Sequence, residues 1–284
     1  MIDKRTTTAV GHGGVRLHVR DYGPAGAPAI LFVHGWSQSY LSWKYQLDSD
    51  LARNYRLVAF DLRGHGTSEV PRSPEAYTQG SVWAADVAAV IESCGLERPV
   101  LVGWSHGSFV VSDYLRHFGD SGLAGVVLLS WAVRLGEGPE GNPYIGPGFK
   151  SSFAGCISDD LAVSIEAVRN FVEACIPHPR STADREEALC YNMIVPPFVR
   201  AAAGRHEPCD NADVLSSMRV PLLAMHGLQD TVVLPESIDL VTAANPKAQV
   251  SLYEHSAHAP FLDNAERFNG ELREFAERAF GQRG

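Results

Sequence analysis

The sequence is poor in positive charge and has no long apolar run. Its 284 residues include 33 acidic and 24 basic residues, which gives a formal net charge of -9. Without a basic run or a basic–aromatic pattern, neither nucleic acid nor an anionic membrane is expected as a partner. No stretch approaches the roughly 18 apolar residues of a membrane span, and no apolar segment follows the charged N-terminal residues, as a secretory signal requires. We therefore expect a cytoplasmic protein.

Cysteine is scarce, and no two cysteines form a C-x-x-C pair. Five cysteines are spread along the chain, at Cys94, Cys156, Cys175, Cys190 and Cys209. This pattern favours free thiols over a disulfide framework or a zinc site. The eleven histidines include no H-E-x-x-H motif, so we predict no metal and no other cofactor. The oligomeric state is not indicated.

Short apolar runs recur along the chain, and each is followed by a small or polar residue. They cover residues 29–33, 55–60, 99–102, 125–129 and 221–225. Continuous apolar runs of this length are typical of parallel strands buried on both faces. Residues 82–94, the stretch after Ser105 and the tail 261–280 have helical spacing instead. The alternation predicts an α/β fold with a mostly parallel sheet flanked by helices.

Two further segments do not follow this alternation of strand and helix patterns. Residues 15–20 alternate strictly between apolar and polar side chains, which predicts an exposed antiparallel edge strand. Between residues 132 and 213 the strand pattern stops: a Gly/Pro-rich segment at 136–143 is followed by helical patches at 161–175 and 185–193. We interpret residues 132–213 as an inserted helical cap, with residues 1–131 and 214–284 forming the core domain.

Residues 103–107 read Gly-Trp-Ser-His-Gly, between an apolar strand run and a helical run. This is the context of a G-x-S-x-G nucleophile elbow, in which Ser105 occupies a strained turn between strand and helix. The positive end of the helix then lies where a negative oxygen develops during acyl transfer. Taken alone, a serine between two glycines is also compatible with an ordinary turn.

Other strand ends supply groups that suit a nucleophilic serine. Residues 34–36, His-Gly-Trp, follow the first buried strand, where such enzymes place an oxyanion donor. We expect the backbone N–H groups of Trp36 and His106 to form the oxyanion hole. Asp230 and His258 each follow a later strand run, which gives the order Ser, Asp, His. His258 would take the serine proton, and Asp230 would hold the imidazole tautomer.

Three residues compete for these roles. His255 precedes His258 by three positions and is a rival base. Asp239 and Asp263 are rival acids, although they lie further from a strand end. We favour Ser105, Asp230 and His258 as the catalytic triad.

At these motifs the sequence resembles the α/β-hydrolase superfamily over nearly its whole length. Residues 61–68, Asp-Leu-Arg-Gly-His-Gly-Thr-Ser, resemble the loop after the fourth strand of that family, which we interpret as structural. Residues 257–260, Ala-His-Ala-Pro, resemble its G-H-x-P pattern and favour His258. The likeness is greatest to bacterial esterases, perhydrolases and cofactor-free haloperoxidases. His106 departs from the Met, Leu or Gln of many relatives, and its ring is a candidate to reach the acyl pocket.

The resemblance implies a carboxylic-ester hydrolase that forms an acyl-serine intermediate on a small, largely apolar ester. We expect an apolar pocket lined by Trp36 together with Trp104, Trp131, Met193 and Phe198, although each is also compatible with simple packing. A thioesterase, lactonase, perhydrolase or carbon–carbon bond hydrolase would use the same triad. A non-catalytic ligand-binding member of the fold is a further alternative. A hydroxynitrile lyase is disfavoured, because residues 151–214 contain no cap lysine.

Overall fold

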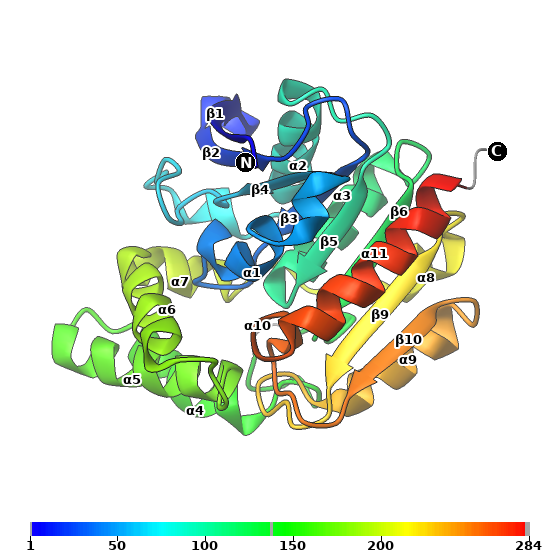
Figure 1. Ribbon diagram of the computed structural model, residues 1–284. Coiled ribbons are helices and arrows are strands. Elements are labelled where there is room, and N and C mark those ends of the chain that lie inside the picture. Colours follow the sequence, from blue (N-terminus) through cyan, green and yellow to red (C-terminus); the bar gives the residue numbers. More distant parts are fainter. Residues whose placement is uncertain (1, 137–138, 282–284) are drawn as a thin grey trace.

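A computed structural model describes residues 2–136 and 139–281. In these residues, eight strands form one sheet in the order β1-β2-β4-β3-β5-β6-β9-β10 (Figure 1). The strands are β1 (Lys4–Val10), β2 (Arg16–Tyr22), β3 (Ala29–Val33), β4 (Arg56–Phe60), β5 (Val100–Trp104), β6 (Gly125–Leu129), β9 (Leu222–Gly227) and β10 (Gln249–Tyr253). From β4 to β10 all neighbours pair in parallel, whereas β1–β2 and β2–β4 are antiparallel.

Helices cover both faces of this sheet, which explains why its central strands are apolar throughout. One face carries α1 (Lys44–Leu47), α10 (Pro260–Asp263) and α11 (Ala265–Gly281), and the other carries α2 (Gly80–Ser93), α3 (His106–Phe118), α8 (Ala212–Ser217) and α9 (Ile238–Ala244) (Figure 1). Every residue of β3, β5, β6 and β9 is buried. The predicted α/β-hydrolase architecture, a mostly parallel sheet flanked by helices, is confirmed.

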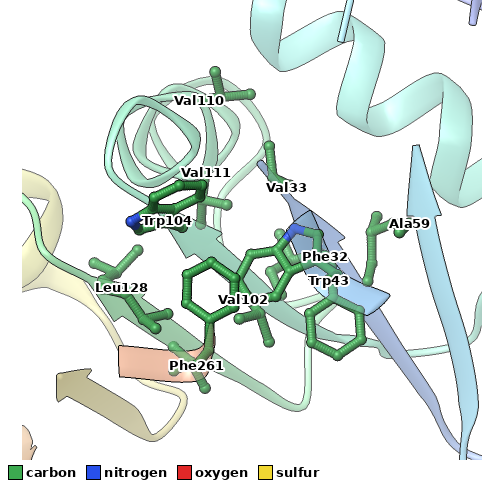
Figure 2. Close-up of a cluster of buried hydrophobic side chains, with 14 of the residues drawn as sticks. Phe32, Val33, Trp43, Ala59, Val102, Trp104, Val110, Val111, Leu128 and Phe261 are labelled. Atoms are coloured by element: carbon green, nitrogen blue, oxygen red, sulfur yellow. The ribbon is translucent and has the colours of Figure 1, made fainter. Parts of the chain in front are cut away.

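Aromatic side chains fill the core beneath the carboxyl ends of β3 and β5. Figure 2 shows Trp43, Trp104 and Phe261 gathered around Val102. The ring of Phe261 stacks on Trp43 with centroids 4.2 Å apart and meets Trp104 edge-on at 4.8 Å. Because Trp104 immediately precedes Ser105, this packing fixes the end of β5 from below.

Between β6 and α8 the described residues leave the sheet and form four helices, grouped at the carboxyl edge of the strands (Figure 1). They are α4 (Pro147–Cys156), α5 (Leu161–Cys175), α6 (Thr182–Ile194) and α7 (Pro197–Ala203). Asp160 caps α5 through the N–H groups of Ala162 and Val163, and Ser181 forms a capping box with Asp184 at the start of α6. This group of helices, α4–α7, is called the cap below.

The two ends of the cap segment meet in a small antiparallel pair. β7 (Arg134–Leu135) lies before the cap helices and β8 (Cys209–Asp210) after them, with Arg134 opposite Asp210 and Leu135 opposite Cys209. An ion pair joins the side chains of Arg134 and Asp210 at 2.8 Å. The inserted segment therefore leaves and rejoins the core at one place, while the limits predicted at residues 132 and 213 stay a prediction.

Two details differ from the sequence prediction. The alternating segment at residues 15–20 does form an antiparallel strand, but β2 is not at the edge, since β1 pairs along its outer side. The sequence Lys-Arg-Thr-Thr-Thr-Ala-Val of β1 has little apolar signal because nearly all of it is exposed or half-buried. The tail predicted as one helix at 261–280 is broken into α10 and α11 near Asn264. In the described residues no helix has the length and apolar character needed to cross a membrane.

Candidate active site

Ser105 lies in a sharp turn between β5 and α3. Its backbone has φ 55° and ψ −119°, a conformation that is uncommon for a residue with a side chain. The turn is held from β6, because Ser105 N donates to Leu129 O at 2.9 Å. Ser108 Oγ, one turn into α3, donates to Gly103 O at 2.8 Å. The strand, turn and helix expected of a nucleophile elbow are therefore present around Ser105.

The two glycines of this motif are required by close backbone contacts. A Cβ atom on Gly107 would lie 2.2 Å from Val33 O, and one on Gly103 would lie 2.7 Å from Gly107 O. No real Cβ approaches a backbone oxygen so closely, so only glycine lets α3 pack this tightly against β3 and β5. The glycine spacing is thus a steric requirement of the turn.

Residues 34–36 lie directly against the elbow. A Cβ on Gly35 would be 3.3 Å from Ser105 Cβ. His34 is fixed behind them: its Nε2 accepts from Leu62 N at 3.0 Å, so Nδ1 carries the proton and donates to Gly35 O at 2.8 Å. In the described residues the backbone N–H groups of Trp36 and His106 donate to no other group. Both remain available as hydrogen-bond donors near Ser105.

Asp230 is buried at the carboxyl end of β9, with both carboxylate oxygens occupied. Its Oδ1 accepts from the N–H groups of Val232 and Val233 at 2.8 and 3.0 Å. Its Oδ2 lies 2.7 Å from His258 Nδ1 and 3.1 Å from His226 Nε2. Burial alone would raise the pKa of Asp230, but His258 and His226 outweigh it and hold the pKa well below its ordinary value. The residue is a carboxylate.

His258 carries one occupied and one free ring nitrogen. Because Nδ1 faces the Asp230 carboxylate, Nδ1 bears a proton, and the neutral ring then has its lone pair on Nε2. Nε2 is buried and has no hydrogen-bond partner among the described residues. The backbone oxygen of His258 accepts from the Trp104 indole N–H at 2.8 Å, which ties the loop to the residue before Ser105. This arrangement suits a general base.

The rival residues lie elsewhere. His255 and Asp239 are exposed to solvent. Asp263 is half-buried in α10, and neither of its carboxylate oxygens bonds a histidine within the described residues. Of the acid and base candidates, only Asp230 and His258 are brought together.

A narrow cavity opens beside Ser105 and His106, with a volume of about 70 Å³. Its walls are mainly apolar and come from the sheet edge and from the cap segment. The residues lining it are Trp36, Ser105, His106, Phe109, Leu135, Gly136, Pro139, Ile145, Phe149, Ala203, Gly204, His206, Val232 and Val233. The cavity thus joins the serine to a small apolar space.

The pocket residues proposed from the sequence need correction, since Trp104, Trp131, Met193 and Phe198 do not line this cavity. Trp104 packs in the core against Phe261. Trp131 is buried behind Phe109, and Phe198 packs against Tyr77. Met193 is only half-buried on α6, and its sulfur lies 4.0 Å from Arg200 Nη1. The direction of each side chain, which composition does not reveal, decides whether it lines the cavity. Trp36 does line the cavity, and so does His106.

His206, which follows α7, lines the cavity and had no distinguishing signal in the sequence. Its Nε2 lies 2.8 Å from Asp113 Oδ2 on α3, and its Nδ1 lies 2.8 Å from Glu207 O. Both partners are acceptors, so both nitrogens donate and the ring is an imidazolium. Burial opposes this charge, but the bond to Asp113 prevails and raises the pKa of His206 to about 10.

His226 is a second residue that the sequence prediction overlooked. It lies four positions before Asp230 at the end of β9, and its Nε2 also contacts Val233 O at 2.9 Å. Since both contacts are to acceptors, Nε2 carries a proton, which it shares between Val233 O and Asp230 Oδ2. The sequence did offer one indication of this role: His226 is a histidine at a strand end, close to the predicted acid Asp230.

The loop at residues 61–68 has a structural role, since its Leu62 N–H donates to the His34 ring and its Asp61 and Arg63 side chains bond within the protein. Asp61 accepts from the N–H groups of Tyr40 and Thr67 at 2.9 and 3.0 Å. Arg63 is fully buried and pairs with both oxygens of Asp86 on α2, each at 2.7 Å. Gly64 and Gly66 have φ of 76° and 51°, which favours glycine.

Within residues 2–136 and 139–281, no group of three or more His, Cys, Asp or Glu side chains could hold a metal ion.

Comparison with known proteins places this geometry in a family. A family model described as the alpha/beta hydrolase fold matches residues 28–265. A non-heme chloroperoxidase of Streptomyces lividans is 28% identical and aligns over 93% of this chain and 97% of its own length. A bifunctional esterase/perhydrolase of Acinetobacter calcoaceticus is 31% identical over 78% of this chain and 80% of its own.

Solved structures agree with this assignment. A protein of Burkholderia cenocepacia proposed to be an aryl esterase has a TM-score of 0.92 and 34% identity, over 98% of this chain and 100% of its own. An esterase of a Rhodococcus species has a TM-score of 0.89 and 33% identity, over 96% and 98% of the two chains. The resemblance to bacterial esterases, perhydrolases and haloperoxidases is therefore confirmed, and the chain belongs to the α/β-hydrolase fold family.

Proposed function

We propose that this protein is a carboxylic-ester hydrolase that uses Ser105 as nucleophile, His258 as general base and Asp230 as the acid that orients it. The observation that carries the proposal is the buried His258–Asp230 pair, which leaves His258 Nε2 without a partner among the described residues. The backbone oxygen of His258 is bonded to Trp104, the residue before the strained serine. The relatives named as esterases support the same reaction class. The reaction needs no cofactor.

The reaction proceeds by two acyl transfers. Ser105 Oγ attacks the ester carbonyl carbon while His258 Nε2 takes the hydroxyl proton. The carbonyl oxygen becomes an oxyanion, to which the backbone N–H groups of Trp36 and His106 donate. His258 passes the proton to the departing alkoxide, which leaves as the alcohol. Water, deprotonated by His258, then releases the carboxylic acid and restores the serine.

Asp230 and its surroundings prepare His258 for this proton transfer. The carboxylate is held in one orientation by two backbone N–H groups, so it accepts from His258 without moving. It also stabilises the imidazolium that forms when His258 takes the proton. His226 donates to the same oxygen and thereby limits how basic Asp230 becomes. This keeps the transferred proton on the imidazole.

The cavity favours a short, uncharged acyl group. Its small volume and its apolar side chains, Phe109, Phe149 and Ile145 among them, disfavour a charged group. The imidazolium of His206 on the wall would compensate little, because it is already paired with Asp113. A short aliphatic chain or a compact ring matches these walls. This agrees with the small, largely apolar ester inferred from the sequence.

A second candidate is perhydrolysis at the same site. The Acinetobacter relative is named as both an esterase and a perhydrolase. In that reaction hydrogen peroxide replaces water in the second step: a peroxide oxygen bonds to the acyl carbon, the bond to Ser105 breaks, and a peracid leaves. The apolar cavity near the serine would limit the competing water.

Hydrolysis of p-nitrophenyl esters from acetate to decanoate tests the proposal, with wild type and Ser105→Ala compared. We expect wild type to prefer short chains and the variant to lose about 10³-fold or more in kcat/KM. Ser130→Ala is the matched control: Ser130 is buried at the end of β6, has a φ of 47° and does not line the cavity. It should keep wild-type activity.

The outcomes separate the candidates. Equal activity of wild type and Ser105→Ala would contradict the serine mechanism. Peracid formation from p-nitrophenyl acetate and hydrogen peroxide, lost in the same variant, would add perhydrolysis. An inactive but folded wild type would require lactones, thioesters and carbon–carbon substrates to be tested next, together with non-catalytic ligand binding.

A further inference from the structure

The cap contains a buried arginine without a carboxylate partner. Arg200 lies on α7 and is 1% exposed. Its Nη2 donates to Ser164 Oγ on α5 at 3.0 Å, its Nη1 has only the Met193 sulfur at 4.0 Å, and its Nε has no partner. Among the described residues, no Asp or Glu carboxylate accepts a hydrogen bond from it. One good acceptor therefore serves five N–H donors.

Arg63 shows how this protein otherwise treats a buried guanidinium. It is equally buried, at 1% exposed, but it binds both oxygens of Asp86 and also donates to His12 O at 3.0 Å. An arginine keeps its charge in proteins, and a buried charge without an opposite charge is strongly unfavourable. The surroundings of Arg200 thus provide too little negative charge.

The titratable neighbours of Arg200 do not fill this gap. Burial raises the pKa of the Cys156 thiol to about 12, so it is uncharged at neutral pH. Burial likewise lowers the pKa of His65 to about 4, so its ring is neutral. Its Nδ1 faces Arg63 O at 2.9 Å, and its Nε2 has no partner among the described residues. Neither group neutralises a guanidinium.

We propose that Arg200 and Ser164 form a site for a small monovalent anion of the chloride or bromide class, buried between α5, α6 and α7. The guanidinium Nε and Nη groups and the Ser164 hydroxyl would donate to it, and one anion would balance the one charge. Ser164 is itself 2% exposed, so the ion must be small and without its hydration shell. The site is separate from the proposed ester hydrolysis.

The site is connected to the cavity through the backbone of α7. The Arg200 carbonyl oxygen accepts from the indole N–H of Trp36 at 2.9 Å, and Trp36 lines the cavity. A bound anion would therefore hold α7 at the position that Trp36 requires. The anion binds away from Ser105 and takes no part in its chemistry.

Anomalous diffraction from wild-type crystals soaked in sodium bromide tests the site directly. We expect a bromide peak within hydrogen-bonding reach of Arg200 Nε and Ser164 Oγ. An ordered water or a buffer carboxylate at that position, or bromide found only at the surface, would overturn the proposal. This measurement needs no variant, so it does not depend on how a variant folds.

Thermal unfolding provides the solution test, at constant ionic strength with bromide replacing gluconate. A saturable rise in Tm is expected for wild type, about 3 °C at roughly ten times the dissociation constant. Arg200→Met should abolish the rise and Ser164→Ala should weaken it. Arg205→Met, at an exposed position five residues further along, should retain it. A rise that persists in Arg200→Met, or no rise in wild type, would refute the site.

Discussion

The carboxyl edge of the sheet and the cap face the same cavity but are held together differently. At the edge, polar groups are fixed by short directional bonds: Asp230 accepts from two backbone N–H groups and two histidines, and Arg63 pairs with Asp86. Around the cavity the cap meets this edge through aromatic contacts, such as Trp36 against Phe149 and Phe171 with centroids 5.1 and 5.2 Å apart, and polar bonds such as Trp36 Nε1 to Arg200 O lie beside them.

The difference indicates a division of roles. Directional bonds fix atoms to within a few tenths of an ångström, as proton transfer and oxyanion binding require. Apolar packing defines a volume but tolerates side chains of similar size. We therefore expect changes at the edge to affect the rate of the chemical step, and changes in the cap to affect which acyl group is accepted.

The largest effect is expected at the edge, from Asp230→Asn. The asparagine amide has one oxygen and one NH2 group, so it cannot accept in the same way from both His258 and His226. It therefore favours the His258 tautomer without a proton on Nδ1, whose Nε2 cannot take the serine proton. We expect kcat to fall about 10⁴-fold, with the protein still folded, as measured with p-nitrophenyl acetate and by circular dichroism. Asp263→Asn alters the rival acid and should change kcat little. A similar loss in both variants would show that Asp230 has no special role.

Gly107→Ala probes the backbone of the edge. The new Cβ would meet Val33 O at 2.2 Å, so α3 must move away from β3. We expect the free energy of unfolding in urea to fall by about 3 kcal/mol or more. Gly270→Ala on α11 meets nothing within 4 Å and should raise it, since alanine favours a helix. Equal stability of the two variants would contradict the packing described for the elbow.

His206 connects the end of the cap to α3, and its effect should depend on pH. The pKa rises from 6.5 to about 10 on folding, so the stabilisation is complete below pH 6.5 and is lost as the pH rises towards 10. We expect the stability difference between wild type and His206→Gln to shrink by about 2 kcal/mol between pH 6 and pH 10. Urea unfolding at both pH values measures it. The exposed His178→Gln should show no such trend, and a difference for His206→Gln that stays constant with pH would argue against the ion pair.

The smallest effect is expected from the cap wall. Phe149→Ala would enlarge the cavity, so kcat/KM for the hexanoate ester should rise about 10-fold relative to acetate. Phe198→Ala removes a cap aromatic that packs against Tyr77 instead and should leave the chain-length profile unchanged. If Phe198→Ala shifted the profile and Phe149→Ala did not, the cavity walls assigned here would be wrong.

Sequence reasoning located groups that follow strand ends, because position along a parallel strand determines position at its carboxyl edge. Ser105, Asp230 and His258 each come after an apolar run, and the described contacts bring Asp230 to His258 and the His258 loop to the elbow. The fold itself followed from the same runs. Strand β1 was missed because an exposed strand of threonines lacks apolar alternation.

The cap resisted prediction for a physical reason. Its helices are recognisable, and α5 spans residues 161–175 as expected, but which helix face turns inward depends on tertiary packing. Met193 and Phe198 were expected at the cavity and are elsewhere, whereas Phe149 and His206 line it. The His206–Asp113 pair joins residues 93 positions apart, and nothing local indicates such a contact.

The short β7–β8 pair has an evolutionary consequence. Since both ends of the cap segment are clamped side by side, the whole insertion is topologically a single surface loop of the sheet. The entropy of closing a loop grows only with the logarithm of its length, so doubling the insertion would cost about 0.6 kcal/mol. Natural selection can therefore lengthen, shorten or replace this segment while the sheet and the residues at its carboxyl edge are kept.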